Sequence, residues 1–378
     1  MRTEQLRIGI DARPIQGSFT GDATYWRGLV DGLSRFETFD DIIVYLDADL
    51  PEPEIMPSGY VRVRYLSAVN WRAWTAWAFP QALREDKVQV AHVQYGIPPL
   101  LPCPVITTVH DVSFKRHPEF FRLKDRLILD TGMKHLAKNA ARILTVSEYS
   151  RKEMLELYNI PYEKIAVVYL GVDKQYKPMD RGAAQELVRT KYGIRAPFIV
   201  TVSVIQPRKN IQGLLEGFAK LKGIQHVEHK LVIVGKYGWK EHHLSRRIRD
   251  LDLTSDVIFT GYVPYEDLPA FYNAADLFVY PSVYEGFGLP PLEAMACGAP
   301  VITGNRSSLP EVVDEAGIMV DPYDSGAFAV AMSNVLSSEA LRAEMSNWGL
   351  AQSRKFSWDE MARHVLSIYH EVGREFAE

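Results

Sequence analysis

Two glutamates with seven residues between them could do chemistry on a sugar. Glu285 lies in a glycine-bearing loop, and Glu293 is predicted in the first turn of the helix that follows. A carboxylate only accepts hydrogen bonds, so each side chain can bind sugar hydroxyl groups. One glutamate can hold a hexose and the other a ribose, which are the two sugars of a nucleotide-sugar.

The backbone between the two glutamates suits a diphosphate. The predicted helix spans residues 291–297, because Pro291 suits a first turn and Gly298 suits the position after the last residue. N–H groups at a helix N-terminus attract anions, and glycine allows close approach. The amides expected there belong to Gly286, Phe287, Gly288 and Leu289. Taken singly, Glu293 more often only complements the helix dipole and Glu285 is more often a solvated loop residue.

Arg208 and Lys209 are adjacent cations just before a helix predicted over residues 211–221. Positive charge opposes the dipole at a helix N-terminus, so this placement is unfavourable unless an anion binds there. The pair can clamp a diphosphate and stabilise its charge as it leaves.

Other candidates follow strands in the first half of the chain. His110 comes after a strand predicted over 105–109, and Gly17 and Gly21 lie in the loop after a strand predicted over 6–10. Ligands of open α/β sheets bind at the carboxyl ends of strands. A lone histidine is nevertheless more often structural. The glycine loop lacks G-x-G-x-x-G spacing, which argues against a dehydrogenase.

Strands and helices alternate in both halves of the chain, which predicts two α/β domains with mostly parallel sheets. A polar, weakly patterned stretch, 174–181, places the boundary near residue 175. The predicted strands span 6–10, 42–46, 88–93, 105–109, 142–147, 165–169, 198–203, 230–235, 256–260, 277–280 and 301–303.

Composition excludes several classes of protein. The chain has 378 residues, 47% of them hydrophobic and 24% charged, with a net charge of −4. These values are typical of a globular protein and argue against a nucleic-acid partner. Two distant cysteines, Cys103 and Cys297, argue against a disulfide-built domain. The start shows no signal-peptide pattern, so we expect a cytoplasmic protein.

Two further patterns have more than one interpretation. Asp47 and Asp49 could hold a divalent ion, but prolines follow at once, so we predict a turn and no metal. Trp71, Trp74 and Trp77 share roughly one helical face, which is usually core. If exposed, the tryptophans and the basic, aromatic run 115–124 predict peripheral membrane contact, although a solvated acceptor groove explains the run equally well.

The segment from Tyr284 to Gly298, YEGFGLPPLEAMACG, resembles the signature of the retaining glycosyltransferases of the GT-B fold, in particular glycosyltransferase family 4. The similarity extends from Ala275 to Glu311 and is strongest to bacterial polysaccharide mannosyltransferases. The family also carries His-Asp at the place of His110 and Asp111. Its arginine and lysine are usually more widely spaced than Arg208 and Lys209.

The resemblance implies two Rossmann-like domains facing across a cleft. Residues 1–175 would be the acceptor-side domain, residues 176–356 the donor domain, and a C-terminal helix, about 357–378, would cross back onto the first domain. His110 would lie beside the donor sugar. The nucleotide base would contact the backbone of Gly261, Tyr262 and Val263, and Gly17 and Gly21 would lie beside the diphosphate. This glycine loop departs from the usual Gly-x-Gly-Arg-Tyr pattern.

The implied activity is retaining, front-face transfer of a hexose, mannose from GDP-mannose, to a hydroxyl of a glycan or lipid-linked acceptor. Neither a cofactor nor a metal is expected. A UDP-hexose donor is the first alternative. An epimerase that acts on a nucleotide-sugar without an acceptor, and a binding protein without activity, are the other two. A cytoplasmic location at the inner face of the membrane fits a lipid-linked acceptor.

Overall fold

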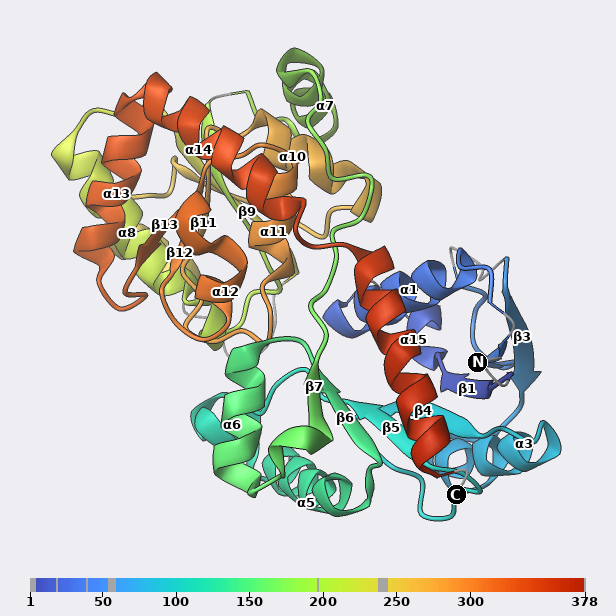
Figure 1. The fold of residues 1–378 in the computed structure, drawn as a ribbon. Helices are drawn as coiled ribbons and strands as arrows, with labels where there is room; N and C mark the ends of the chain where they lie inside the picture. Colours follow the sequence, from blue (N-terminus) through green and yellow to red (C-terminus); the bar gives the residue numbers. More distant parts are fainter. Residues whose placement is uncertain are drawn as a thin grey trace. The chain divides into compact units, whose positions relative to one another are not determined.

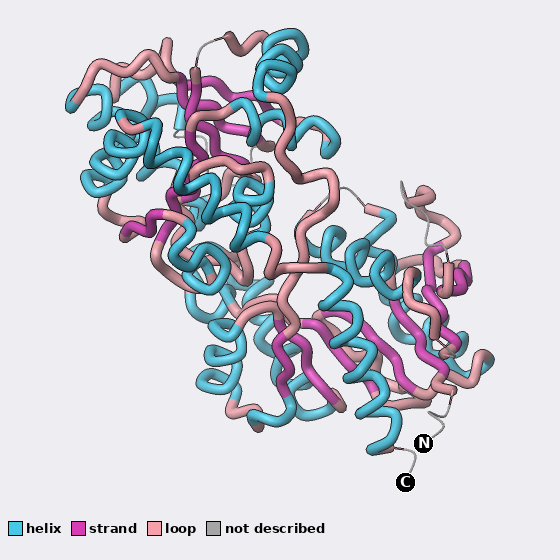
Figure 2. The backbone as a smooth tube through the Cα atoms, turned by 45° about the horizontal axis from the view of Figure 1, so that its top comes forward, coloured by secondary structure: helices cyan, strands magenta, loops and turns pink. Residues whose placement is uncertain are grey.

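The computed structural model describes residues 5–17, 20–38, 40–53, 59–195, 197–236 and 244–376. The chain divides into two compact units, one of Met1–Gly171 with Ser357–Glu378 and the other of Val172–Phe356. Each unit is built around its own sheet, with helices packed against it (Figures 1 and 2).

The first unit has a seven-stranded sheet in the order β3-β2-β1-β4-β5-β6-β7. All neighbouring strands are parallel. The order reverses beside β1, where an open α/β sheet leaves a crevice at its carboxyl edge. The strands are β1 (Arg7–Asp11), β2 (Asp41–Asp47), β3 (Val61–Leu66), β4 (Val90–Gln94), β5 (Val105–Thr108), β6 (Arg142–Thr145) and β7 (Ile165–Val167).

The C-terminal helix α15 (Trp358–Glu375) packs in the first unit against α1 (Gly21–Ser34) (Figure 1). Close packing requires Gly28, since a Cβ there would lie 2.2 Å from the Trp358 ring. The other helices and turns of this unit are η1 (Arg13–Gln16), α2 (Trp71–Ala73), η2 (Trp74–Ala78), α3 (Phe79–Glu85), α4 (Ser113–Arg116), η3 (Pro118–Phe120), α5 (Leu123–Asn139), α6 (Glu148–Tyr158) and η4 (Tyr162–Lys164).

The second unit has a six-stranded parallel sheet in the order β10-β9-β8-β11-β12-β13. Its strands are β8 (Phe198–Val202), β9 (Lys230–Val234), β10 (Val257–Gly261), β11 (Leu277–Tyr280), β12 (Val301–Gly304) and β13 (Ile318–Val320). Its helices are α7 (Arg181–Tyr192), η5 (Pro207–Lys209), α8 (Ile211–Ile224), α9 (Leu244–Asp250), η6 (Tyr265–Asp267), α10 (Leu268–Ala274), α11 (Leu289–Ala296), α12 (Leu309–Val313), η7 (Asp314–Ala316), α13 (Ser325–Ser337) and α14 (Glu339–Ser353).

The core of each unit consists of strands buried on both faces. Every residue of β8, β11 and β12 is buried, which explains why the sequences of these strands are near-continuous apolar runs. In the second unit, α8 and α13 pack together and cover one face of the sheet with Leu214, Phe218, Phe328 and Met332.

These sheets confirm the predicted α/β fold of two Rossmann-like units. Every predicted strand is present, with its ends within two residues of the expected positions. The sequence patterns missed β3, whose residues are only partly buried, and β13, which has three residues. Among the described residues, no helix combines the length and the apolar character needed to cross a membrane.

Candidate active site

A buried cluster of opposite charges joins η5 to the loop after β11. Lys209 Nζ donates to Glu285 Oε1 at 2.5 Å, and Arg208 Nη1 donates to Glu285 Oε2 at 2.7 Å. Ser282 Oγ also donates to Oε1, at 2.5 Å. Only 6% of Glu285 is exposed. The structure therefore brings the predicted cations and the first glutamate together, and we call Arg208, Lys209 and Glu285 the charge cluster.

The local backbone explains how two adjacent cations reach one carboxylate. Arg208 and Lys209 lie in the single 3-10 turn η5, and Asn210 then adopts the left-handed conformation with φ of 51°. The Asn210 side chain caps α8 by accepting from the Gly213 N–H. The Val283 N–H donates to the Arg208 carbonyl at 2.9 Å, which ties η5 to the loop.

The charges of the cluster determine the protonation of Glu285. Burial alone would raise the pKa of this carboxyl, but Arg208 and Lys209 outweigh burial and lower the pKa of Glu285 to about 2. Lys209 also donates to the Tyr280 hydroxyl at 2.6 Å. Glu285 is thus ionised at neutral pH, and two cations face one anion. The excess positive charge favours binding of a further anion.

Serine side chains hold the loop that carries Glu285. Ser308 Oγ contacts the carbonyl oxygens of Glu285 and Phe287 at 2.9 and 2.6 Å, and Ser307 Oγ accepts from the Glu285 N–H. Gly288 has φ of 121°, a conformation that strongly favours glycine. These contacts hold the backbone of residues 285–287 just ahead of α11. The sequence patterns did not reveal these contacts, because each serine lies more than 20 residues from Glu285 in the chain.

Glu293 lies in the second turn of α11, because the helix begins at Leu289, two residues earlier than predicted. The prediction that Glu293 lies in the first helical turn is wrong, because Leu289 and Pro290, and not only Pro291, belong to the helix. Glu293 is 8% exposed, and the Tyr272 hydroxyl donates to its Oε2 at 2.8 Å. Burial raises the pKa of Glu293 to about 7.

The predicted base-binding loop follows β10 in the same unit. Gly261 has φ of 71°, and a Cβ there would meet no atom within 4 Å among the described residues. Its backbone conformation, rather than crowding, therefore favours glycine. Tyr262 is half exposed and its ring lies 4.4 Å from Lys236 Nζ, whereas Val263 is buried.

His110, Gly17 and Gly21 lie in the first unit, separate from the residues above. His110 Nε2 is 3.5 Å from Asp22 Oδ1, and the Tyr25 ring packs edge-on against the imidazole at 4.9 Å. Burial lowers the pKa of His110 against the opposing effect of Asp22, so the imidazole is neutral at pH 7. Gly17 follows η1 and Gly21 begins α1. Residues 18 and 19 of this loop lie outside the described residues.

The three tryptophans do not share one environment. Trp74 is buried, whereas 66% of Trp71 and 73% of Trp77 is exposed. A π-helical turn over Trp74–Ala78 changes the rotation per residue, so the predicted single helical face is wrong. The Asp49 N–H donates to Asp47 Oδ1 at 3.0 Å, which confirms the predicted turn.

The first two cations of the basic, aromatic run 115–124 form local ion pairs. Lys115 pairs with Asp130 at 3.0 Å, and Arg116 Nε pairs with Glu153 at 2.7 Å. Phe114 is buried. The exposed apolar side chains begin at Leu123, near the end of this run, and continue along α5 with Leu127 and Ile128.

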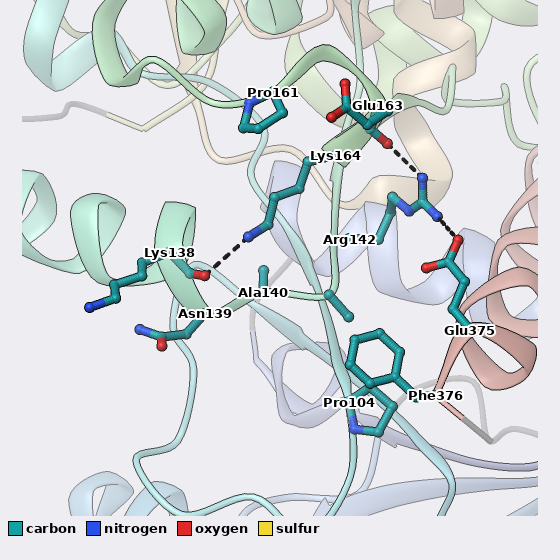
Figure 3. A pocket seen from close by; sticks show the side chains of 11 residues that line it. Pro104, Lys138, Asn139, Ala140, Arg142, Pro161, Glu163, Lys164, Glu375 and Phe376 are labelled. Atoms are coloured by element: carbon teal, nitrogen blue, oxygen red, sulfur yellow. Dashed lines mark hydrogen bonds and ion pairs between the residues drawn. The ribbon is translucent and has the colours of Figure 1, made fainter. Parts of the chain in front are cut away.

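A cavity of about 580 Å³ lies where β6 and β7 begin (Figure 3). Arg142 donates to the Glu163 carbonyl at 2.6 Å and pairs with Glu375 at 2.7 Å. Lys164 Nζ donates to the Lys138 carbonyl at 3.2 Å. Arg142 thereby holds the end of α15 against the sheet, and Lys164 binds the end of α5, so both cations have structural roles.

Comparisons with known proteins match both units. Residues 20–176 match the family described as Glycosyltransferase Family 4, and residues 185–351 match Glycosyl transferases group 1. O-antigen chain mannosyltransferase B of Escherichia coli is 38% identical over 267 residues, which are 70% of this chain and 69% of that protein.

A second sequence relative and one solved structure differ in the share of their length that this chain covers. The serotype-specific mannosyltransferase WbdA of Escherichia coli is 32% identical over 255 residues, 64% of this chain but only 31% of that protein. The chain thus spans about a third of this relative. The crystal structure of Anabaena HepE in complex with UDP and glucose has a TM-score of 0.71 and 18% identity, covering 97% of this chain and 99% of that chain. At this identity the likeness shows the fold alone.

We expect Glu293→Gln to remove part of the pH dependence of stability. The pKa of Glu293 is about 7 when folded, against 4.5 as its ordinary value, so only the folded protein keeps the proton between these values. Wild-type stability therefore falls as pH rises from 4.5 through 7, by about 3 kcal/mol in total, whereas the glutamine variant lacks this contribution. Urea unfolding at pH 5 and pH 8 measures the difference. Glu315→Gln, at an exposed position, is the control, and an equal pH dependence for all three proteins would contradict the assignment.

Proposed function

The chain belongs to the group 1 and family 4 glycosyltransferases of the GT-B fold, and from this premise we propose that it transfers mannose from GDP-mannose to a hydroxyl of a glycan or lipid-linked acceptor. The charge cluster is the observation that carries the proposal. Two cations, the buried Lys209 and the partly buried Arg208, are held by one carboxylate before a diphosphate arrives. Such preorganised charge stabilises a leaving diphosphate without reorganisation during the reaction.

Each part of the donor has a proposed partner in the second unit. The Glu285 carboxylate accepts hydrogen bonds from hexose hydroxyls, and Glu293 accepts them from the ribose. The diphosphate lies against Arg208, Lys209 and the backbone of residues 286–289, at the N-terminus of α11. The base contacts the backbone of residues 261–263. A raised pKa at Glu293 means that ribose binding to the carboxylate competes with a proton at neutral pH.

We propose front-face transfer with retention of configuration. The bond between the anomeric carbon and the phosphate oxygen breaks, and a new bond forms from that carbon to the acceptor oxygen on the same face. The leaving phosphate oxygen takes the proton of the acceptor hydroxyl, so no protein group need form a covalent bond to the sugar. Neutral His110, at the carboxyl edge of the first sheet, contacts the reacting sugar and helps to orient it.

We propose that transfer needs no metal ion, because Arg208 and Lys209 supply the positive charge at the diphosphate. We expect Arg208→Ala and Lys209→Ala each to lower the rate about 10²-fold or more, through lost stabilisation of the leaving group. Release of GDP, measured in the presence of EDTA, tests both statements. Lys220→Ala, an exposed cation on α8 that bonds Ser325, should leave the rate unchanged. Near-normal rates in both cluster variants would contradict the assignment, and loss of wild-type activity in EDTA with recovery in magnesium would contradict metal independence.

The names of the relatives favour mannose, since both are mannosyltransferases. A UDP-hexose is the second candidate, because the HepE structure holds UDP and glucose and the proposed contacts are common to both donors. The ribose and diphosphate contacts do not distinguish the bases.

Calorimetry with GDP, UDP and their hexose conjugates decides between the donors, and we expect GDP-mannose to bind most tightly. Glu293→Gln should weaken binding of GDP and GDP-mannose alike. Glu285→Gln should mainly slow transfer, because the part of the donor that Glu285 is proposed to contact is the hexose. A clear preference for a UDP-sugar would exclude GDP-mannose while leaving glycosyl transfer intact.

We propose that α5 contacts the membrane surface when the acceptor is lipid-linked. Leu123, Leu127 and Ile128 are each more than half exposed on this helix. Between the two leucines lie Lys124, Asp125 and Arg126, which together carry a net charge of +1. Apolar side chains beside cations bind anionic lipid reversibly.

Flotation with vesicles that contain phosphatidylglycerol measures this contact. We expect binding that weakens with salt and is lost in Leu123→Glu with Leu127→Glu. Trp348→Glu, at an exposed apolar position on α14, is the control. The same binding in all three proteins, or none in the wild type, would rule out α5 as the contact.

A further inference from the structure

A cavity of about 570 Å³ lies wholly in the first unit, at the carboxyl edge of its sheet. Asp11, Asp47 and Gln94, the last residues of β1, β2 and β4, line it. Its volume is typical of small-molecule sites, which span roughly 300–1,000 Å³. Trp71 also lines it, and we call it the Trp71 pocket.

The charged side chains of the Trp71 pocket disfavour anions. Among the described residues, four carboxylates line it, those of Asp11, Asp22, Asp47 and Asp49, against one guanidinium, that of Arg13. Arg13 is already engaged: its Nε and Nη2 bond the Asp11 carboxylate at 2.9 and 2.7 Å. The net charge of −3 repels phosphate and carboxylate groups.

Gln94 adds a hydrogen-bond donor, which a bare metal ion would leave unsatisfied. Gln94 Oε1 accepts from Trp26 Nε1 at 2.5 Å, which sets the orientation of the amide, and Gln94 Nε2 is buried without a hydrogen-bond partner among the described residues. An unmet amide donor needs an acceptor atom, which a metal ion does not provide. The described acidic and histidine side chains also form no group of three that could hold a metal.

A sugar hydroxyl satisfies both requirements, because it donates to a carboxylate and accepts from an amide. The pocket also offers apolar contact: Trp71 is 66% exposed, and the Arg72 guanidinium lies 5.3 Å from the ring centre, so a sugar would stack on the opposite face. Indole rings pack well against the C–H face of a pyranose.

The Trp71 pocket adjoins the proposed reaction edge. Asp22 lines the pocket and lies 3.5 Å from His110 Nε2, an atom without a hydrogen-bond partner among the described residues. Tyr95, another lining residue, packs its ring 5.7 Å from that of His110. Tyr95 has φ of 55°, an uncommon conformation for a bulky residue, and such residues cluster at functional sites.

We propose that the Trp71 pocket binds the acceptor through an uncharged sugar unit, one that bears hydroxyl groups but neither phosphate nor carboxylate. Trp71 stacks on the ring, the carboxylates accept its hydroxyl protons, and Gln94 Nε2 donates to a hydroxyl oxygen. This inference rests on the proposed glycosyl transfer and specifies the chemical class of the acceptor. On a lipid-linked acceptor, the sugar and not the phosphate enters the pocket.

Saturation-transfer NMR with methyl α-mannoside and its 6-phosphate tests the pocket without any donor. We expect the wild type to bind the neutral mannoside at least tenfold more tightly than the phosphate, because of the carboxylates. Trp71→Ala should weaken mannoside binding about tenfold through lost stacking. Trp77→Ala, similarly exposed but outside the pocket, should have no effect. Asp49→Lys, in an exposed turn, should reduce the preference against the phosphate.

Absence of mannoside binding, equal or tighter binding of the phosphate, or equal effects of Trp71→Ala and Trp77→Ala would overturn the proposal. Transfer from GDP-mannose, assayed separately, would then still test the proposed function on its own. If Trp71→Ala is unfolded by circular dichroism, the Asp49→Lys result decides. If Asp49→Lys prefers the neutral mannoside over its phosphate as strongly as the wild type does, that result would also contradict the proposal.

Discussion

Burial of one carboxylate between two cations is the interaction on which the proposed donor site depends. A buried charge without a partner is very costly, so Glu285 and Lys209 can be buried only as a pair, and the partly exposed Arg208 adds a second cation to the same carboxylate. The three side chains come from η5 and from the loop after β11, and their mutual attraction ties these segments to each other. With two cations to one anion, the cluster has excess positive charge before any substrate binds. The same interaction thus organises the loop and favours an anionic ligand.

The two glutamates of the motif differ because their surroundings differ. Glu285 has cationic partners and stays ionised, whereas Glu293 faces tyrosine hydroxyls and carries a raised pKa. Desolvation acts on both carboxyls, and only the nearby charges separate them. This difference agrees with the separate roles proposed for the two glutamates. Glu285 lies in the charged part of the site, whereas Glu293 is proposed to bind the two uncharged hydroxyl groups of the ribose.

The proposed donor and acceptor sites have opposite electrostatic character, each within its own unit. The charge cluster has an excess of positive charge, whereas the Trp71 pocket has a net charge of −3. A diphosphate is therefore attracted to the second unit and repelled from the pocket of the first. Such complementarity gives specificity, because a ligand of the wrong charge is repelled electrostatically as well as lacking favourable contacts.

The alternating elements, the parallel sheets and the identities of the two glutamates and two cations could be predicted from the amino-acid sequence alone. Strands such as β8 and β11 are buried on both faces, so they must be continuous apolar runs, and glycine and proline mark the ends of α11. Their signals are local, which is why the sequence patterns contain them. Three features could not be predicted from the sequence. Glu285 contacts both cations, and Glu293 is buried beside Tyr272. Trp74 is buried, whereas Trp71 lines a pocket. The partners in these contacts lie far apart in the chain or on opposite sides of a π-helical turn, so only tertiary packing sets their distances, their burial and therefore their charge states.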